Sequence, residues 1–410
     1  MNRILTATAI TNLMDLNDDC LLTILDYFDL FELVKIRGVC HRLDILIDSY
    51  RYKYLTFESK IRKLNFLYDV LKFLGPTVQN LTIDYSRGEV NSNSSIIIEW
   101  IAALCENLET LSLIYVDINK PDEFSSILKQ LKSLTLKCPL IENSLAECFI
   151  GAKKLEELKI FENDLISEKF FENIFNLKSL SIVDCKNVTT YDTIFKNNFS
   201  IEKLEINLSF EQDSSSVNSI VNQLRGIQEL FVIVRGPVNI NRFAELPKLQ
   251  KLKIEINQRF VGQNEVDINE LLEKLSKKNK IEELSLINFQ TINCEKLAKL
   301  TNLKKLKVDV WWFNHNVELL RNLKNLEYLS LGKKLIPADI LLSIIKEMKN
   351  LKYFRIQSGN VRKLEMQRNE DKTWSLSCND MKGPQNFEEL AVLGHQVESD
   401  QNLIDFVDSL

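Results

Sequence analysis

Side chains that could catalyse a reaction are few in this sequence. It has only three histidines, His41, His315 and His395, and it lacks P-loop, G-x-G-x-x-G, G-x-S-x-G and H-E-x-x-H motifs. Carboxylates are abundant, but their spread indicates no paired acid and base. Eight cysteines show no C-x-x-C pair and no histidine at metal-ligand spacing, which is typical of reduced thiols. We therefore expect no catalytic residue, no metal site, no cofactor and no enzyme activity.

The net charge and the apolar runs of the sequence limit which partners and which cellular compartment we expect. The chain carries 52 basic and 57 acidic residues, a net charge of −5, so no overall positive field would draw a nucleic acid. No apolar run is long enough for a membrane span, and the N-terminal MNRILTATAIT is too weakly apolar for a signal peptide. We expect a cytoplasmic or nuclear protein that binds neither nucleic acid nor membrane.

The stretch from Leu16 to Tyr54 predicts three short helices. Asn17 can cap the first, Asp29 the second, and Gly38 can end the second. Apolar residues recur at helical spacing in each segment, but three helices this short bury only a thin core. Some apolar surface is therefore expected to remain for a partner.

This stretch has an acidic helix start at Asp18 and Asp19, an apolar first helix, the pair Asp29-Leu30, and the run Val39-Cys40-His41-Arg42. The order of these residue types resembles an F-box, over residues 12–54. Two positions depart from the family pattern, with Asn17 where proline is usual and Leu43 where tryptophan is usual. The resemblance implies docking on a Skp-type adaptor and, through it, on a cullin–RING ligase. The residues that it assigns to the adaptor contact are Leu16, Leu21, Leu22, Ile24, Leu25, Leu30, Leu33, Val39, Cys40 and Arg42.

From Leu81 onward one pattern, apolar-x-x-apolar-x-apolar, recurs twelve times, the last copy lying around Phe354. Its middle apolar residues are 22 to 32 residues apart, and amphipathic helical segments fill many of the gaps. The pattern resembles leucine-rich repeats, whose short strands stack in parallel because a single repeat cannot bury both faces. Asn163 and Cys185 stand where the family closes its strand turn, and Asn288 stands one position early.

The two resemblances together predict an α/β leucine-rich-repeat solenoid over residues 55–360, following the three-helix module in sequence. Residues 361–410 are expected to cap it, with a hairpin around the polar segment 368–372, a degenerate strand at 387–393 and a short helix at 403–410.

Alternation within each strand places polar residues on the predicted concave face of the sheet. Lys251, Lys253, Lys305 and Lys307 could form a basic patch that receives an acidic or phosphorylated segment, but nearby carboxylates favour a mixed, solvated face. The aromatic run from Trp311 to Phe313 is either an interface anchor or part of the core. Candidate target-binding residues are Lys253, Lys307, Trp311, Trp312, Tyr328, Tyr353 and Arg355.

The combined resemblance predicts a substrate-recognition subunit of an SCF-type cullin–RING E3 ubiquitin ligase, with an unknown protein as its target. The alternative is a leucine-rich-repeat interaction scaffold with a decayed F-box and no ligase.

Overall fold

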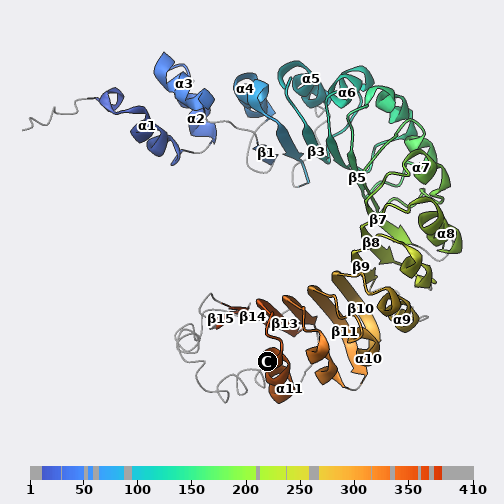
Figure 1. Cartoon of the computed structure of the whole chain (residues 1–410). Coiled ribbons are helices and arrows are strands. Elements are labelled where there is room, and N and C mark those ends of the chain that lie inside the picture. Colours follow the sequence, from blue (N-terminus) through green and yellow to red (C-terminus); the bar gives the residue numbers. More distant parts are fainter. Residues whose placement is uncertain are drawn as a thin grey trace, which may run out of the picture. The chain divides into compact units, whose positions relative to one another are not determined.

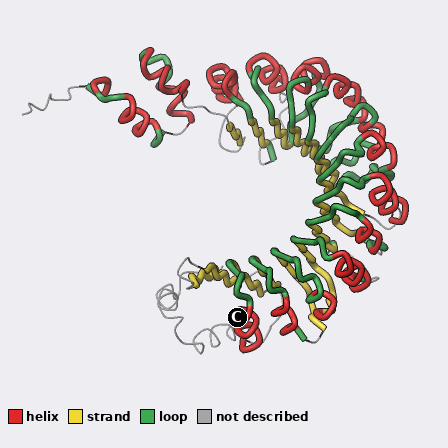
Figure 2. Tube along the Cα trace, viewed as in Figure 1, coloured by secondary structure: helices red, strands yellow, loops and turns green. Residues whose placement is uncertain are grey.

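The structure is a computed structural model that describes residues 12–28, 30–49, 54–58, 64–86, 95–208, 213–236, 238–257, 267–314, 316–332, 338–358, 362–368 and 374–380. The chain divides into two compact units, Met1–Ile174 and Phe175–Leu410, called here the first and second unit. In both, parallel strands lie side by side and helices cover one face of them (Figures 1 and 2). The opposite face, predicted to be concave, is called the open face below.

The first unit begins with the predicted three-helix module. A 3-10 turn, η1 (Leu13–Asp15), precedes α1 (Asp18–Leu25), α2 (Leu30–Ile36) and α3 (His41–Ser49). The Asn17 side chain caps α1 by accepting a hydrogen bond from the Cys20 amide at 2.9 Å. Gly38 follows α2 with a φ of +85°, a backbone conformation that favours glycine. These features confirm the predicted helices, whereas Asp29 lies outside the described residues.

The core of this module is thin, as expected. Among the described residues it contains five buried residues, with partly buried neighbours such as Leu16, Leu22 and Phe28 packed against them. The five are Leu21, Leu25, Leu33, Leu46 and Ile47. Beyond the module, the Arg37 guanidinium lies 5.1 Å from the centre of the Phe73 ring in α4 (Leu64–Leu74), so the module contacts the first repeat.

The sheet of the first unit is parallel throughout. Its strands, in order, are β1 (Tyr54–Glu58), β2 (Asn80–Asp84), β3 (Thr110–Ile114), β4 (Ser133–Lys137) and β5 (Glu157–Phe161). Its covering helices after α4 are η2 (Gly75–Thr77), α5 (Ser95–Leu104), α6 (Pro121–Leu128), η3 (Asn143–Gly151) and η4 (Glu168–Phe171).

The second unit continues the same plan, and its last described strands form a hairpin. Its parallel strands are β6 (Ser179–Val183), β7 (Lys203–Leu208), β8 (Glu229–Val234), β9 (Lys251–Ile256), β10 (Glu283–Asn293), β11 (Lys305–Asn314), β12 (Tyr328–Gly332) and β13 (Tyr353–Ser358). The antiparallel strands β14 (Arg362–Arg368) and β15 (Trp374–Asp380) follow. Its helices are α7 (Asp192–Asn197), α8 (Asp213–Gln223), η6 (Asn241–Glu245), α9 (Ile268–Lys278), α10 (Cys294–Leu297), η8 (Val317–Asn322) and α11 (Ala338–Glu347).

All twelve predicted hexads are strands, β2 to β13, and the predicted hairpin is β14–β15. The segments 387–393 and 403–410 lie outside the described residues. Helix length follows repeat length. The gaps of 25 or more residues hold α5, α8, α9 and α11, each with ten or eleven residues, whereas shorter gaps hold α-helices of at most eight residues or 3-10 helices. A short gap leaves too few residues for several helical turns.

The residues that the repeat pattern singles out lie at the ends of their strand segments, and Asn163 closes its turn with side-chain hydrogen bonds. Asn163 is fully buried, donates to the carbonyls of Cys138 and Ile141 at 2.7 and 3.0 Å, and accepts from two backbone amides at 2.9 Å. Cys185 is also buried. Asn288, one position early in the sequence, occupies a β-bulge in β10 with a φ of 62°.

A second set of side-chain bonds links neighbouring repeats and was not predicted. An asparagine or glutamine just before a strand hexad donates to a backbone carbonyl of the preceding repeat, as Asn350 does to Lys324 at 2.9 Å. The residues that share this arrangement are Asn107, Gln130, Asn302, Asn325 and Asn350. The sequence signal was a recurring N-L or Q-L at the start of a hexad.

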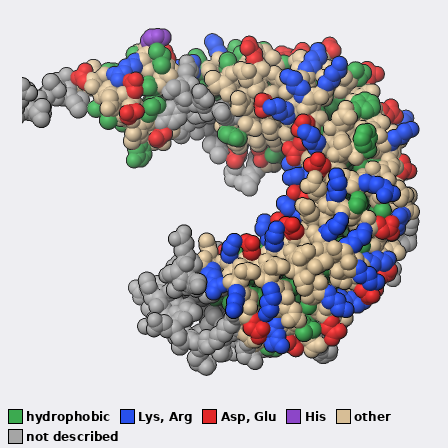
Figure 3. Space-filling model, in the orientation of Figure 1, with side chains coloured by type: hydrophobic (Ala, Val, Ile, Leu, Met, Phe, Trp, Pro, Cys, Tyr) green, Lys and Arg blue, Asp and Glu red, His purple; other side chains and the backbone are tan. Residues whose placement is uncertain are grey.

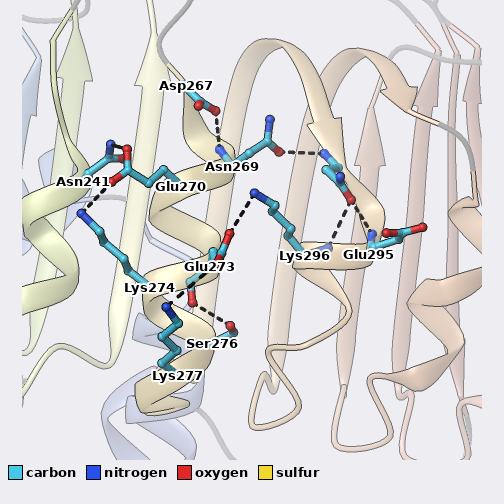
Figure 4. A network of polar contacts seen from close by, with 11 residues as sticks. Asn241, Asp267, Asn269, Glu270, Glu273, Lys274, Ser276, Lys277, Glu295 and Lys296 are labelled. Carbon is cyan, nitrogen blue, oxygen red and sulfur yellow. Dashed lines mark hydrogen bonds and ion pairs between the residues drawn. The ribbon is translucent and has the colours of Figure 1, made fainter.

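Polar caps also connect neighbouring helices of the second unit (Figure 4). Asp267 caps α9, Asn293 caps α10, and the Asn293 amide donates to Asn269 at 3.1 Å. Lys296 of α10 reaches Glu273 of α9 at 3.1 Å. These contacts satisfy helix-end amides and fix the spacing between successive repeats.

Candidate interaction surfaces

Three of the residues assigned to the adaptor contact are core residues of the module. Leu21, Leu25 and Leu33 are only 1%, 3% and 4% exposed. They therefore hold the helices together, and they form no exposed apolar patch with Ile24 in the isolated chain. The physical reason is that helices this short must bury part of their own apolar stripe to form any core.

Arg42 is also engaged within the module. Its guanidinium donates to Asp18 at 2.6 and 2.9 Å and to the carbonyls of Met14 and Leu16 at 2.6 and 2.7 Å. The side chain thus ties the start of α3 to the start of α1, and its role is structural in the isolated chain.

The other assigned residues reach the surface to different extents. Val39 is 69% exposed, while Leu16, Leu22, Ile24 and Cys40 are half-buried. The side chain of Leu30 lies outside the part of the chain that the structure describes.

Sequence reasoning missed three exposed apolar residues in the module. Leu13, Tyr27 and Ile45 are 51%, 87% and 54% exposed. Ile45 lies on the side of α3 turned away from Leu46 and Ile47. An apolar residue out of phase with the buried stripe was the signal that could have identified it.

The two departures from the F-box pattern leave the fold intact. Asn17 supplies the helix cap, and Leu43 is 6% exposed, so leucine fills the apolar position where tryptophan is usual.

The open face is built in rows because neighbouring strands pair in register. In the second unit the central row runs across eight strands from Ser181 to Arg355 in the predicted order. Its members are Ser181, Glu205, Phe231, Lys253, Ser285, Lys307, Ser330 and Arg355.

The row beside it alternates in charge across five strands, β7 to β11, and is called here the charge ladder. Glu229 lies 3.5 Å from Lys203 and 3.0 Å from Lys251, and Glu283 lies 3.6 Å from Lys251 and 3.1 Å from Lys305. Burial opposes ionisation of Glu229, but hydrogen bonding from Lys251 and the nearby lysine charges outweigh it and lower the pKa of this carboxyl. In Figure 3, basic and acidic side chains lie interleaved on the visible surface of the second unit.

The lysines expected to form a basic patch are therefore mostly neutralised. Lys251 and Lys305 belong to the charge ladder, and Lys253 lies 3.5 Å from Glu255 and 3.5 Å from the centre of the Phe231 ring. Only Lys307 among these four has no carboxylate within 4 Å in the described residues. The mixed-face interpretation fits this geometry better than a continuous basic patch.

The aromatic candidates separate into two groups. Tyr328 and Tyr353 stack with ring centres 4.8 Å apart and planes 4° apart, and the Tyr353 hydroxyl donates to Glu365. Burial and this hydrogen bond raise the pKa of Tyr353. Trp311 and Trp312 lie on β11, but their side chains are outside the described part of the structure.

Within the described residues, no group of histidine, cysteine and acidic side chains is arranged to hold a metal ion. Seven cysteines, from Cys20 to Cys294, are free. No described helix has the length and apolarity needed to cross a bilayer.

This chain is similar to a known domain family and to several solved structures. The F-box domain family model matches residues 13–55. A chain of the yeast Rad7–Elc1 complex is 17% identical, with a TM-score of 0.51 over 82% of this chain and 85% of that chain. An internalin (inlF) from Listeria monocytogenes is 15% identical, with a TM-score of 0.42 over 70% of this chain and 75% of that chain. No match was found among curated proteins.

The match at residues 13–55 coincides with η1 and α1 to α3, and the stacked parallel strands that follow have the architecture of leucine-rich repeats. An F-box implies binding of a Skp-type adaptor, so the chain has the general organisation of a substrate receptor. It carries an F-box domain at residues 13–55, followed by a leucine-rich-repeat-like solenoid of stacked strands.

Proposed function

We propose that this chain is the substrate-recognition subunit of an SCF-type cullin–RING E3 ubiquitin ligase. The F-box docks on a Skp-type adaptor, and the solenoid binds a protein target for ubiquitination. The observation that carries this proposal is the F-box at residues 13–55, folded as three helices that leave large apolar side chains exposed.

The docking surface combines exposed and half-buried apolar residues of the module. The five-residue core leaves Val39, Ile45 and Tyr27 largely in water, and burying each against a partner would contribute about 1–2 kcal/mol. Leu22 and Ile24 of α1 lie beside the core and can extend this surface. The buried leucines and Arg42 hold the three helices in the arrangement that presents this surface.

Ubiquitination needs no bond-breaking group from this chain. A receptor that binds adaptor and target together raises the local concentration of the target's lysines beside a charged ubiquitin-conjugating enzyme. The chain's task is then positional, and its non-catalytic composition supports this role.

The target is assigned to the open face of the second unit. Support comes from the charged and aromatic rows of this face, which include Lys253, Lys307, Tyr328, Tyr353 and Arg355. Trp311 and Trp312 stay candidates because β11 continues the same sheet.

Reconstitution tests the proposal. The purified chain is mixed with a Skp-type adaptor and a cullin–RING assembly that lacks its own F-box subunit, and is then analysed by gel filtration. We expect co-elution by the wild type, loss in a Val39→Asp, Ile45→Asp variant, and retention in Phe199→Asp, whose side chain is 66% exposed on the second unit. A folded wild type that stays separate from the adaptor would leave a repeat scaffold without a ligase.

A further inference from the structure

One basic residue on the open face of the second unit differs from the others. Strands β7 to β13 carry six lysines and arginines. Five of them have a carboxylate within 4 Å: Lys203, Lys251, Lys253, Lys305 and Arg355. Lys307 is exposed and has no such partner among the described residues.

Small hydroxyl side chains flank Lys307 on both sides. Ser285 of β10 and Ser330 of β12 stand directly opposite it in the sheet, each one strand away, about 4.8 Å. Ser330 is 5% exposed, and the Ser285 hydroxyl is buried without a hydrogen-bond partner in the described structure. Lys307 therefore lies between two short serine side chains, beside the Ser285 hydroxyl, which has no hydrogen-bond partner in the described structure.

Two stacked tyrosines, Tyr328 and Tyr353, lie near Lys307. Tyr328 precedes Ser330 by two residues on the same face, which places it about 8 Å diagonally from Lys307. It stacks on Tyr353 with ring centres 4.8 Å apart, so the two rings hold each other in place.

The charges around Lys307 determine on which side of it an anionic ligand can bind. Glu255 and Glu283 are engaged by lysines, and Glu365 is engaged by Tyr353 and lies 3.9 Å from Arg355. Asp309 follows Lys307 by two residues on the side away from Tyr328, packed over Gly332. An anion is therefore favoured on the tyrosine side of Lys307 and disfavoured on the Asp309 side.

We propose that Lys307, the Ser285 hydroxyl and the Tyr328–Tyr353 pair form a binding site for an acidic side chain in an extended segment of the target protein. This inference rests on the proposed function and specifies its target class. The carboxylate accepts hydrogen bonds from the Lys307 ammonium and the Ser285 hydroxyl, and a neighbouring aromatic or apolar residue of the segment packs on the tyrosines.

Peptide binding to the full chain tests this site. Short fluorescent peptides of alternating glutamate and phenylalanine are compared by anisotropy with glutamine–phenylalanine peptides of equal length. We expect preference for the glutamate series, weakened by added salt, and an affinity about fivefold lower for Lys307→Ala. Lys305→Ala is the matched control on the same strand, because Glu283 already neutralises that lysine.

Equal binding of both peptide series, or equal losses in the two lysine variants, would overturn the proposal. A phosphoserine–phenylalanine series distinguishes the source of the anion: tighter binding that also depends on Lys307 would reject a carboxylate as the preferred ligand in favour of a phosphate. Adaptor binding by Lys307→Ala is measured in parallel and should equal that of the wild type. A chain that fails to bind the adaptor but discriminates the peptides would reject the ligase role alone.

Discussion

Arg42 and Asp18 join the starts of two helices that are adjacent in space but 24 residues apart in sequence. The Arg42 guanidinium contacts the Asp18 carboxylate at 2.6 Å, and the same group donates to two carbonyls of the segment before α1. A basic residue that sequence resemblance assigned to a partner thus closes the module on itself. The F-box must be held in shape before it can present a surface.

Replacing Arg42 should therefore loosen the F-box. Arg42→Ala removes four charge-assisted hydrogen bonds, and because the side chain is 40% exposed we expect a loss of only about 1–2 kcal/mol in module stability. Amide hydrogen exchange over residues 13–49 measures it. Asp18→Asn is the milder control, since both carbonyls remain available to Arg42. Unchanged protection in Arg42→Ala would mean that this clasp does not stabilise the module.

Asn163 should be far less replaceable than the asparagines that link repeats at the surface. Asn163→Ala leaves two carbonyls and two amides without their partner, so we expect the free energy of unfolding to fall by about 3 kcal/mol. Asn350→Ala removes one exposed bond and should cost about 1 kcal/mol or less. Urea denaturation compares the two variants, and equal losses would contradict the turn-closing role of Asn163.

The charge ladder should contribute modestly and depend on salt and pH. Glu229→Gln breaks two partly exposed ion pairs, with an expected loss below about 1 kcal/mol that shrinks in high salt. Since the folded-state pKa of Glu229 is lowered, its contribution is present above the unfolded-state pKa and is lost as pH falls through the folded-state value. Denaturation at neutral and acidic pH, at two salt concentrations, measures both effects. A loss independent of salt would point to packing instead.

Thiol reactivity should follow burial. Burial raises the pKa values of Cys105 and Cys294 to about 12, so both stay protonated and unreactive at neutral pH, whereas Cys20 is exposed. Iodoacetamide labelling followed by mass spectrometry should modify Cys20 first and the two buried thiols only after unfolding. Rapid labelling of Cys105 in the folded chain would show that the segment after α5 opens readily.

The positions of the strands could be predicted from the sequence more accurately than which side chains are exposed or paired at the surface. Period-two alternation around residues such as Leu134 and Leu329 identifies a strand and its buried face, because each repeat must bury the same positions. The division of the F-box leucines between core and surface could not be predicted, since Leu21 and Ile24 are equally apolar and only packing separates them. The ion pairs of Lys251 and Lys305 also depended on register, which places residues from three strands side by side.

Adaptor affinity is the measurement that tests the central claim most directly. Titration calorimetry with a purified Skp-type adaptor would compare the wild type, Val39→Asp, Ile45→Asp and the control Phe199→Asp, after circular dichroism has shown that each is folded. We predict tight binding by the wild type and the control, and a loss of about tenfold or more for each F-box variant, because each places a charge in an apolar contact. A folded wild type without measurable affinity for the adaptor would contradict the assignment as a ligase receptor.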